Sequence, residues 1–327
     1  MFDQIIIDEK NKYILSKAID YNRVNHCYIF VGPEGTNKRK TAIEFSRAIL
    51  CSVDNKPCNH CTSCNKMDSG NHPDFIEIFP LESSIKISQI REIQKKMNVK
   101  SYEGDKKVFI INNCETMGIP AQNSLLKTLE EPNAGVYIIL ISESKERILP
   151  TILSRGQILY FNPLDKETFK SSLRKKYSLK ESLLDDVYEL SQGCIEKAEN
   201  IIKNPEEIDQ FKIFRKYIFS IMKGDYSQIF EFSKWIKDEK LSNEYVINNL
   251  LILFKNALYA KVNGSLNVYK EISECLTYEG FHDIIGNIII LQGDLKYNVN
   301  LQLQIERLLL RIQEEKLIND KGHRNTV

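Results

Sequence analysis

The sequence predicts an α/β core built on a parallel sheet, followed by a C-terminal half made of helices. Between residues 27 and 161, short apolar runs rich in β-branched residues alternate with amphipathic stretches, which is typical of a parallel sheet covered by helices. After about Pro163 the strand pattern fades and amphipathic helical patterns take over. At roughly 100–200 residues per domain, a chain of 327 residues is long enough for two or three domains.

Each expected element can be placed on the sequence. The runs expected to form strands are 27–31, 75–79, 107–111, 136–142 and 158–161. The segments 87–97 and 121–131 carry apolar residues at helical spacing, and the second ends before Pro132. Further helices are expected at 211–222, 245–261 and 301–316. Gly193 separates two short helical patterns between about 165 and 205, so we expect three segments, 1–162, 163–206 and 207–327.

Charge and composition exclude several classes of protein. Lys and Arg number 45 against 44 Asp and Glu, so no global field draws the chain onto nucleic acid or an anionic membrane, and any DNA contact needs a local patch. No apolar run approaches the ~18–20 residues of a membrane span, and the N-terminus lacks the pattern of a signal peptide. We therefore expect a cytoplasmic protein, in which the eight cysteines are reduced.

Half of the cysteines fall in one short segment, CSVDNKPCNHCTSC. They are Cys51, Cys58, Cys61 and Cys64. Two-residue gaps let successive thiolates turn toward one ion, and four thiolates at ~2.3 Å suit tetrahedral Zn²⁺ with no position left for water, which predicts a structural zinc site. Free thiols or a redox pair are the alternatives. His60 and His72 lie nearby, but four sulfurs already complete the shell.

The segment after the first expected strand is a damaged phosphate-binding loop. The strand runs into GPEGTNKRKTA and then into a helical pattern, which is the context that a Walker A motif requires. Gly32 and Lys38 match the motif and Gly35 lies between them, but Asn37 replaces the second glycine and Arg39 the hydroxyl residue that ligates Mg²⁺. The missing glycine should disturb the backbone that closes around phosphates. The alternative is a plain strand-to-helix turn.

The strand at 107–111 gives an independent test of ATP hydrolysis. An ATPase of this class places two carboxylates at its end, to hold Mg²⁺ and polarise water, and this chain has Asn112 and Asn113 there. Amides carry no charge and cannot act as a general base. Glu115 comes two positions late and is expected to follow the next loop. We infer a P-loop fold without catalysis of its own.

The order of the motifs carries a family resemblance. GPEGTNK, the four cysteines, IKISQIREI (85–93), NSLLKTLEEP (123–132) and LPTILSRG (149–156) together resemble the delta-prime family of bacterial DNA polymerase III clamp-loader subunits, which are AAA+ proteins. The motifs cover about residues 1–205, and the rest matches by helical character and length. The resemblance implies an AAA+ domain at 1–162 with an inserted zinc module at 51–64, a small helical lid at 163–206 and an all-α collar at 207–327.

The resemblance also assigns roles to single residues. Ser154 and Arg155 match the family's Ser-Arg-Cys motif, whose arginine reaches the nucleotide site of the neighbouring subunit, while Gly156 replaces the cysteine. The alternative for Arg155 is a surface arginine that caps a helix or pairs with a carboxylate. Ser142 falls at the sensor-1 position. Glu196 stands where active relatives carry the sensor-2 arginine, and an acid there repels triphosphate.

Two further features have two readings each. In IKISQIREI, Ser88 is expected to be a helix N-cap with Arg91 one turn later, a pair suited to DNA phosphates in the assembled ring, although a solvated helix face explains them equally well. The apolar stripe of the last helix either packs its own domain or meets neighbouring subunits. Its members include Leu301, Ile305, Leu308 and Leu309.

Together these features predict a subunit without enzymatic activity of its own. The expected role is to help load the sliding clamp onto primed DNA, in a hetero-pentamer with gamma/tau and delta subunits, with structural zinc as cofactor and no membrane partner. Whether the damaged loop binds ATP is left open. One alternative is an active gamma/tau-type ATPase, and the other is a stand-alone zinc-containing DNA-binding protein, which a basic patch would favour.

Overall fold

The chain forms two compact units. A computed structural model describes residues 2, 5–54, 56–264, 269–295 and 301–324, with side chains in the last range described for 303–315. The α/β unit comprises residues 1–180 and 193–199, and the helical unit comprises residues 181–192 and 200–327. The segment 163–206 contributes to both units, so its status as a separate domain stays a prediction.

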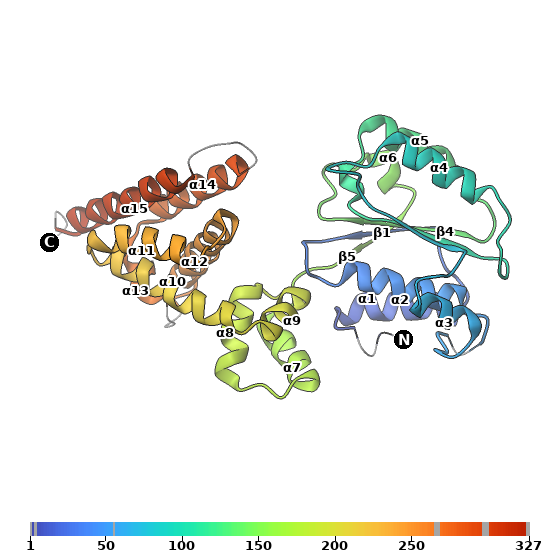
Figure 1. The fold of residues 1–327 in the computed structure, drawn as a ribbon, viewed down its shortest axis with the longest axis horizontal. Helices are drawn as coiled ribbons and strands as arrows, with labels where there is room; N and C mark the ends of the chain where they lie inside the picture. The colour runs from blue at the N-terminus through green and yellow to red at the C-terminus, as the bar shows by residue number, and fades with distance from the viewer. Residues whose placement is uncertain (1, 3–4, 55, 265–268, 296–300, 325–327) are drawn as a thin grey trace. The chain divides into compact units, whose positions relative to one another are not determined.

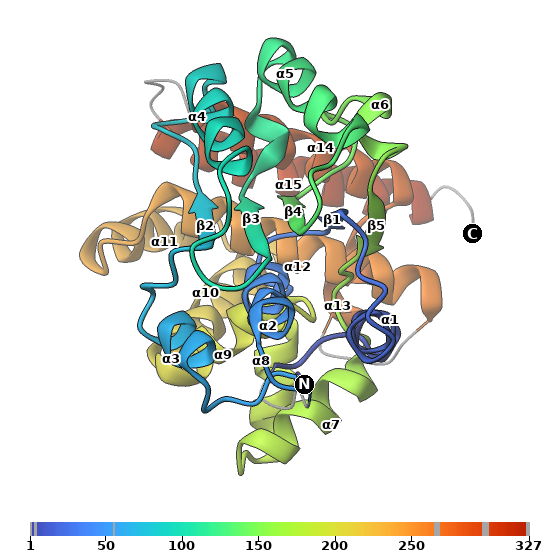
Figure 2. The same ribbon diagram turned by 90° about the vertical axis from the view of Figure 1, so that its right-hand side faces the viewer.

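The α/β unit is built on one parallel sheet. Its strands are β1 (Cys27–Val31), β2 (Phe75–Ile78), β3 (Lys107–Ile111), β4 (Val136–Ser142) and β5 (Gln157–Tyr160). They lie in the order β2-β3-β4-β1-β5, and every neighbouring pair is parallel (Figure 2). The five strands predicted from apolar runs are confirmed, with ends shifted by at most one residue.

Helices cover both faces of this sheet (Figure 1). One face carries α4 (Ile87–Met97), α5 (Ile119–Glu130) and α6 (Pro150–Leu153), and the other carries α1 (Glu9–Asp20), α2 (Lys38–Leu50) and α3 (Thr62–Asp68). The side chains of β1 divide between the two faces with the period of two that a strand imposes. Cys27, Ile29 and Val31 join the core beneath α4 and α5, whereas Tyr28 and Phe30 join the core beneath α1 and α2.

The helical unit has its own apolar core. It contains α8 (Glu181–Ser191), α10 (Glu206–Met222), α11 (Ser227–Asp238), α12 (Asn243–Asn263), α13 (Lys270–Cys275), α14 (Tyr278–Asp294) and α15 (Leu301–Arg324). Ile305, Leu308 and Leu309 of α15 are buried in this core, so the described part of the predicted stripe packs its own unit. The side chain of Leu301 lies outside the described residues.

The remaining two helices follow the sheet in sequence. Helix α7 (Lys166–Lys176) belongs to the α/β unit, and α9 (Ile195–Lys203) begins in that unit. Within the described ranges, no helix is both long enough and apolar enough to cross a membrane.

Candidate functional site

The damaged phosphate loop lies at the carboxyl ends of the strands, where parallel α/β sheets bind ligands. Residues 32–37 connect the end of β1 to the start of α2. The Gly32 N–H donates to the Ser142 carbonyl at the end of β4 (3.1 Å), which fixes the loop to the neighbouring strand. A Cβ atom at Gly32 would lie 2.0 Å from the Phe161 carbonyl oxygen, so only glycine fits this position.

Two residues of the loop have left-handed backbone conformations. Gly35 and Asn37 both have left-handed backbones, with φ of 82° and 60°, and asparagine is among the few other residues that tolerate this region. The Asn37 side-chain amide is buried and donates to the Ile6 carbonyl (3.0 Å). Asn37 thus has a backbone conformation that glycine adopts readily, and the effect of the missing glycine on phosphate binding stays a prediction.

Lys38 is turned into its own loop. Its Nζ donates to the carbonyls of Gly32 (2.6 Å) and Pro33 (2.7 Å). Burial lowers the pKa of Lys38, while the carboxylates of Glu143 and Glu115 act in the opposite direction. Glu115, expected to follow the next loop, is thus near enough for its charge to act on this lysine. Acids around the ammonium weaken its attraction for a phosphate.

The corner at which an ATPase holds Mg²⁺ is filled by an ion pair. The Arg39 guanidinium binds Glu77 of β2 through two hydrogen bonds, Nε to Oε1 (2.6 Å) and Nη2 to Oε2 (2.8 Å). Asn112, at the end of β3, donates from Nδ2 to the same Glu77 Oε1 (2.8 Å). The hydrogen bond to Glu77 raises the pKa of Arg39, so the guanidinium stays charged. A fixed cation lies beside the strand end that would bear the metal-binding acids.

Sequence reasoning missed Glu77. The only signal for it was an acid within the otherwise apolar run FIEIF. Asn113, the second predicted amide, has a left-handed backbone (φ 49°) and precedes a short turn of 3₁₀ helix, Cys114–Thr116. Asn113 thus shapes the turn after β3, and Asn112 alone of the two takes part in the network with Arg39.

Ser142 and Glu196 both lie near the loop but are committed to other contacts. The buried Ser142 hydroxyl donates to the Ser144 carbonyl (2.5 Å). The Glu196 N–H donates to the Gly35 carbonyl (2.9 Å), and its carboxylate lies 3.3 Å from Nζ of Lys40. The aliphatic part of the Lys197 side chain packs against the loop. A Cβ atom on Gly35 would lie only 2.9 Å from the Lys197 Cγ.

A cavity beside the loop is too small for a nucleotide base. It has a volume of about 10 Å³ and is lined by residues including Ile7, Thr36, Phe161 and Ile195. Such a volume accommodates about one water molecule. The space on the side of Asn37 is open, because a larger cavity of about 940 Å³ there is lined by Asn37 and Lys40 among other residues.

Arg155 lies at the surface and is held on two sides. Its Nη1 donates to the Thr151 carbonyl (2.9 Å) and more weakly to the Ser154 hydroxyl (3.4 Å). Its Nη2 lies 2.8 Å from Oε1 of Glu130, at the end of α5. The alternative for Arg155 was a surface arginine that caps a helix or pairs with a carboxylate. Arg155 makes both kinds of contact, with the Thr151 carbonyl and with Glu130. They leave 34% of the Arg155 side chain exposed.

Gly156 is required by the packing beneath Arg155. A Cβ atom there would lie 2.7 Å from Cγ1 of Ile29 and 3.0 Å from Sγ of Cys27. Cys27 and Ile29 are fully buried on β1. The sulfur of Cys27 lies in the space into which a side chain at residue 156 would point. This contact between distant segments could not be predicted from the sequence alone.

The four clustered cysteines meet in space. One sulfur from each lies within 4.8 Å of the others, and the pairs Cys51–Cys61 and Cys58–Cys64 are each 3.9 Å apart. Sulfurs at ~2.3 Å from a tetrahedral Zn²⁺ would be about 3.8 Å apart. Cys51 caps the end of α2, and Cys61 caps the start of α3. The geometry fits a four-sulfur metal site.

Backbone donors in this cluster favour thiolates. The N–H of Cys61 points to Sγ of Cys58 (3.3 Å), and the N–H of Cys64 points to Sγ of Cys61 (3.4 Å). Burial raises the pKa of Cys61, but hydrogen bonds from the Cys64 N–H and from neighbouring thiols lower it to about 6. Burial raises the pKa of Cys64. A bound cation would favour the thiolate at every position.

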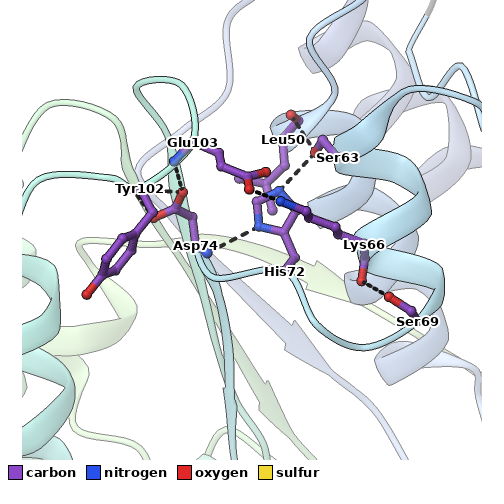
Figure 3. Close-up of polar contacts among 8 residues, drawn as sticks. All are labelled: Leu50, Ser63, Lys66, Ser69, His72, Asp74, Tyr102 and Glu103. Atoms are coloured by element: carbon purple, nitrogen blue, oxygen red, sulfur yellow. Dashed lines mark hydrogen bonds and ion pairs between the residues drawn. The ribbon is translucent and has the colours of Figure 1, made fainter.

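His72 supports this module through a chain of hydrogen bonds rather than as a ligand (Figure 3). The Asp74 N–H donates to His72 Nδ1 (3.2 Å), so the ring carries its proton on Nε2 and donates to the Ser63 hydroxyl (3.0 Å). Ser63 in turn donates to the Leu50 carbonyl (2.9 Å). Nδ1 of His60 forms a hydrogen bond with the carbonyl oxygen of Cys58 (2.6 Å).

The predicted cap of α4 is corrected by the structure. The helix begins at Ile87 with Lys86 as N-cap, and the Lys86 N–H donates to the Gln89 side chain (2.9 Å). The capping oxygen thus comes from Gln89, three positions after the N-cap. Ser88 lies inside the first turn and is exposed. Arg91 is also exposed, and its contact with DNA stays a prediction.

Comparison with known proteins identifies relatives of the whole chain. A curated DNA polymerase III subunit delta' from Bacillus subtilis is 28% identical over 92% of this chain and 94% of its own length. The corresponding protein of Escherichia coli is 24% identical over 89% of this chain and 90% of its own length. A sequence model for the family described as DNA polymerase III, delta subunit, matches residues 7–165. Over most of its length, the chain is thus similar to DNA polymerase III delta-prime subunits.

Other members of the polymerase III group are also similar. The DNA polymerase III subunit tau of Bacillus subtilis is 24% identical over 95% of this chain, which spans 61% of that longer protein. A crystal structure of a DNA polymerase III gamma subunit-related protein from Thermotoga maritima has the same fold, with a TM-score of 0.51 at 18% identity over 92% of this chain and 99% of that chain. The similarity to delta-prime subunits is therefore accompanied by a fold shared with a gamma subunit-related protein.

Proposed function

We propose that this chain is a clamp-loader subunit of the DNA polymerase III holoenzyme that acts in DNA replication without hydrolysing ATP. The carrying observation is the bidentate contact of Arg39 with Glu77, beside Asn112, at the corner where a motor subunit would hold Mg²⁺. A guanidinium cannot ligate a cation, and the amides Asn112 and Asn113 cannot activate water. Lys38, bonded to two loop carbonyls, supports the same proposal.

The contribution to catalysis is made in a neighbour's site. Arg155 is anchored by the Thr151 carbonyl and is one-third exposed, so its guanidinium is available to another subunit. A planar, permanently charged group of this kind stabilises charge on a transferring γ-phosphoryl group, an effect of about 10³–10⁵ in rate. The partners of this proposal are gamma/tau and delta subunits in a hetero-pentamer, the sliding clamp and primed DNA.

The cysteine cluster serves as a structural zinc site. Cys51, Cys58, Cys61 and Cys64 fill a four-coordinate shell, and their sulfurs lie close to tetrahedral spacing. A closed shell of four thiolates gives no position to a substrate or water, so zinc here stabilises the fold of residues 51–64 and takes no part in turnover. The reading as a stand-alone DNA-binding protein is disfavoured by the balance of 45 Lys and Arg against 44 Asp and Glu, which provides no overall attraction to nucleic acid.

Turnover of ATP by the reconstituted loader tests this proposal. With clamp and primed DNA present, Arg155→Ala should cause a large loss of turnover, Lys38→Ala should cause little change, and Arg23→Ala provides a matched exposed arginine on the same unit. The opposite pattern, a large loss for Lys38→Ala and none for Arg155→Ala, would establish an active gamma/tau-type motor.

A further inference from the structure

The exposed Arg155 forms an ion pair with Glu130 of the same chain. Nη2 of Arg155 lies 2.8 Å from Oε1 of Glu130, and the two side chains are 34% and 49% exposed. Glu130 is the last residue of α5, and Arg155 follows α6. The pair therefore joins the ends of two helices at the surface that also carries the Ser-Arg motif.

The two sides of the guanidinium are held differently. Nη1 is bonded to the Thr151 carbonyl (2.9 Å), and the Arg155 N–H is bonded to the Ile152 carbonyl (3.0 Å), so the root and one nitrogen are fixed to α6. Among the described residues, Glu130 is the partner of Nη2, and none accepts a hydrogen bond from Nε. The nitrogens that could bind a phosphate in a bidentate manner are thus Nε and Nη2, of which Glu130 already holds one.

We propose that Glu130 competes for Nη2 of Arg155 with the γ-phosphate of a nucleotide on the neighbouring subunit, while the Thr151 carbonyl keeps Arg155 in place. This inference rests on the proposed role of Arg155 in a neighbour's site. A triphosphate carries more negative charge than one carboxylate, so it displaces Glu130 from Nη2 while the contact of Nη1 with Thr151 persists. Because a carboxylate beside a γ-phosphate is also repulsive, Glu130 has to turn away when ATP is engaged.

The expected change in the ATP concentration for half-maximal turnover follows from the strength of an exposed ion pair. Exposed ion pairs contribute little, equivalent to a factor of about 1.4–5 in an equilibrium constant. Removing the charge of Glu130 should therefore lower the ATP concentration for half-maximal turnover by about two- to five-fold and leave the maximal rate nearly unchanged. Salt screens exposed charges, so the difference between wild type and variant should shrink as ionic strength rises.

The test uses the reconstituted loader with clamp and primed DNA, and turnover measured over a range of ATP concentrations. The variant is Glu130→Gln, which keeps the shape and removes the charge. Glu131→Gln is the matched control, since Glu131 is the adjacent residue and is exposed. Both substitutions are repeated in the Arg155→Ala background, where a competitor of Arg155 has nothing left to compete for.

The expected result is a two- to five-fold lower KM for Glu130→Gln, no change for Glu131→Gln, and no effect of Glu130→Gln in the Arg155→Ala background. An unchanged or higher KM, a lower kcat, or the same effect in both backgrounds would overturn the inference. If Arg155→Ala itself leaves turnover unchanged, the proposed function fails. If Arg155→Ala abolishes turnover while Glu130→Gln changes nothing, only the competition fails.

Discussion

The packing beneath Arg155 makes Gly156→Ala a sharp test of the structural reasoning. The added Cβ would lie 2.7 Å and 2.8 Å from two carbons of Ile29 and 3.0 Å from the sulfur of Cys27, well inside the ~3.5–4.0 Å of a relaxed carbon contact. Ile29 belongs to β1, which is paired on both edges, with β4 and β5. The strand cannot withdraw from the new methyl group without breaking backbone hydrogen bonds on one edge.

The expected loss follows from two opposing effects. Overpacking a buried position costs about 1–3 kcal/mol, and replacing glycine by alanine returns about 0.4–1 kcal/mol through the unfolded chain. We therefore expect the free energy of unfolding to fall by about 1–2 kcal/mol. Gly118→Ala is the control, because its Cβ would meet its nearest neighbour, the Pro120 Cδ, at an ordinary 3.7 Å.

Urea unfolding measures this difference. Far-UV circular dichroism follows both units, while fluorescence of Trp235, the single tryptophan of the chain, reports on the helical unit. The loss should appear in the dichroism transition, and the double variant Cys27→Ala/Gly156→Ala should lose less than the sum of its parts, because one of the close contacts is gone. Equal unfolding free energies for Gly156→Ala and Gly118→Ala would refute the steric reasoning.

Three further predictions concern the ion pair, the cysteines and the buried histidine. Arg39→Ala should lower the unfolding free energy by about 1–2 kcal/mol, a value between those of exposed and buried ion pairs. The reason is that Glu77 is only 12% exposed and loses a bidentate partner. A loss no larger than that caused by Arg91→Ala, at an exposed arginine, would contradict this prediction. Metal chelation or Cys64→Ser should lower Tm by about 5–15 °C, whereas Cys275→Ser, in the helical unit, should leave the response of Tm to chelation intact. Burial lowers the pKa of His72 below its ordinary 6.5, so the unfolded chain takes up the proton first and stability should fall as pH drops below about 6.5. Unfolding at pH 5–8 should show a steeper decline for wild type than for His72→Gln, and parallel curves would exclude a contribution from His72.

Much of the fold could be predicted from local sequence. Strands such as 107–111 are short apolar runs between amphipathic stretches, and the period of their side chains is set by the backbone. The cysteine cluster could be predicted because spacing alone brings the thiols together. The N-cap of α4 was misplaced by two residues, at Ser88 instead of Lys86, because Ser88 is a good cap by type but the Gln89 side chain accepts the Lys86 N–H.

The partners of the site residues could not be predicted in this way. Glu77 meets Arg39 because β2 lies beside β3 in the sheet, and Cys27 fills the space beside Gly156 because β5 pairs with β1. Glu130 reaches Arg155 from another helix. These contacts depend on strand order and register, which a single sequence does not specify. The left-handed backbone of Asn37 could not be predicted either, because residue type alone does not fix φ.

The guanidinium of Arg39 is a cation that belongs to the chain. A bound magnesium ion leaves when its concentration falls or when nucleotide departs, and its occupancy obeys mass action. The charge that lies between the start of α2 and the edge strand β2 cannot dissociate, and its local concentration is fixed by the covalent backbone. The charge at this end of the sheet therefore stays the same whether or not magnesium or nucleotide is present.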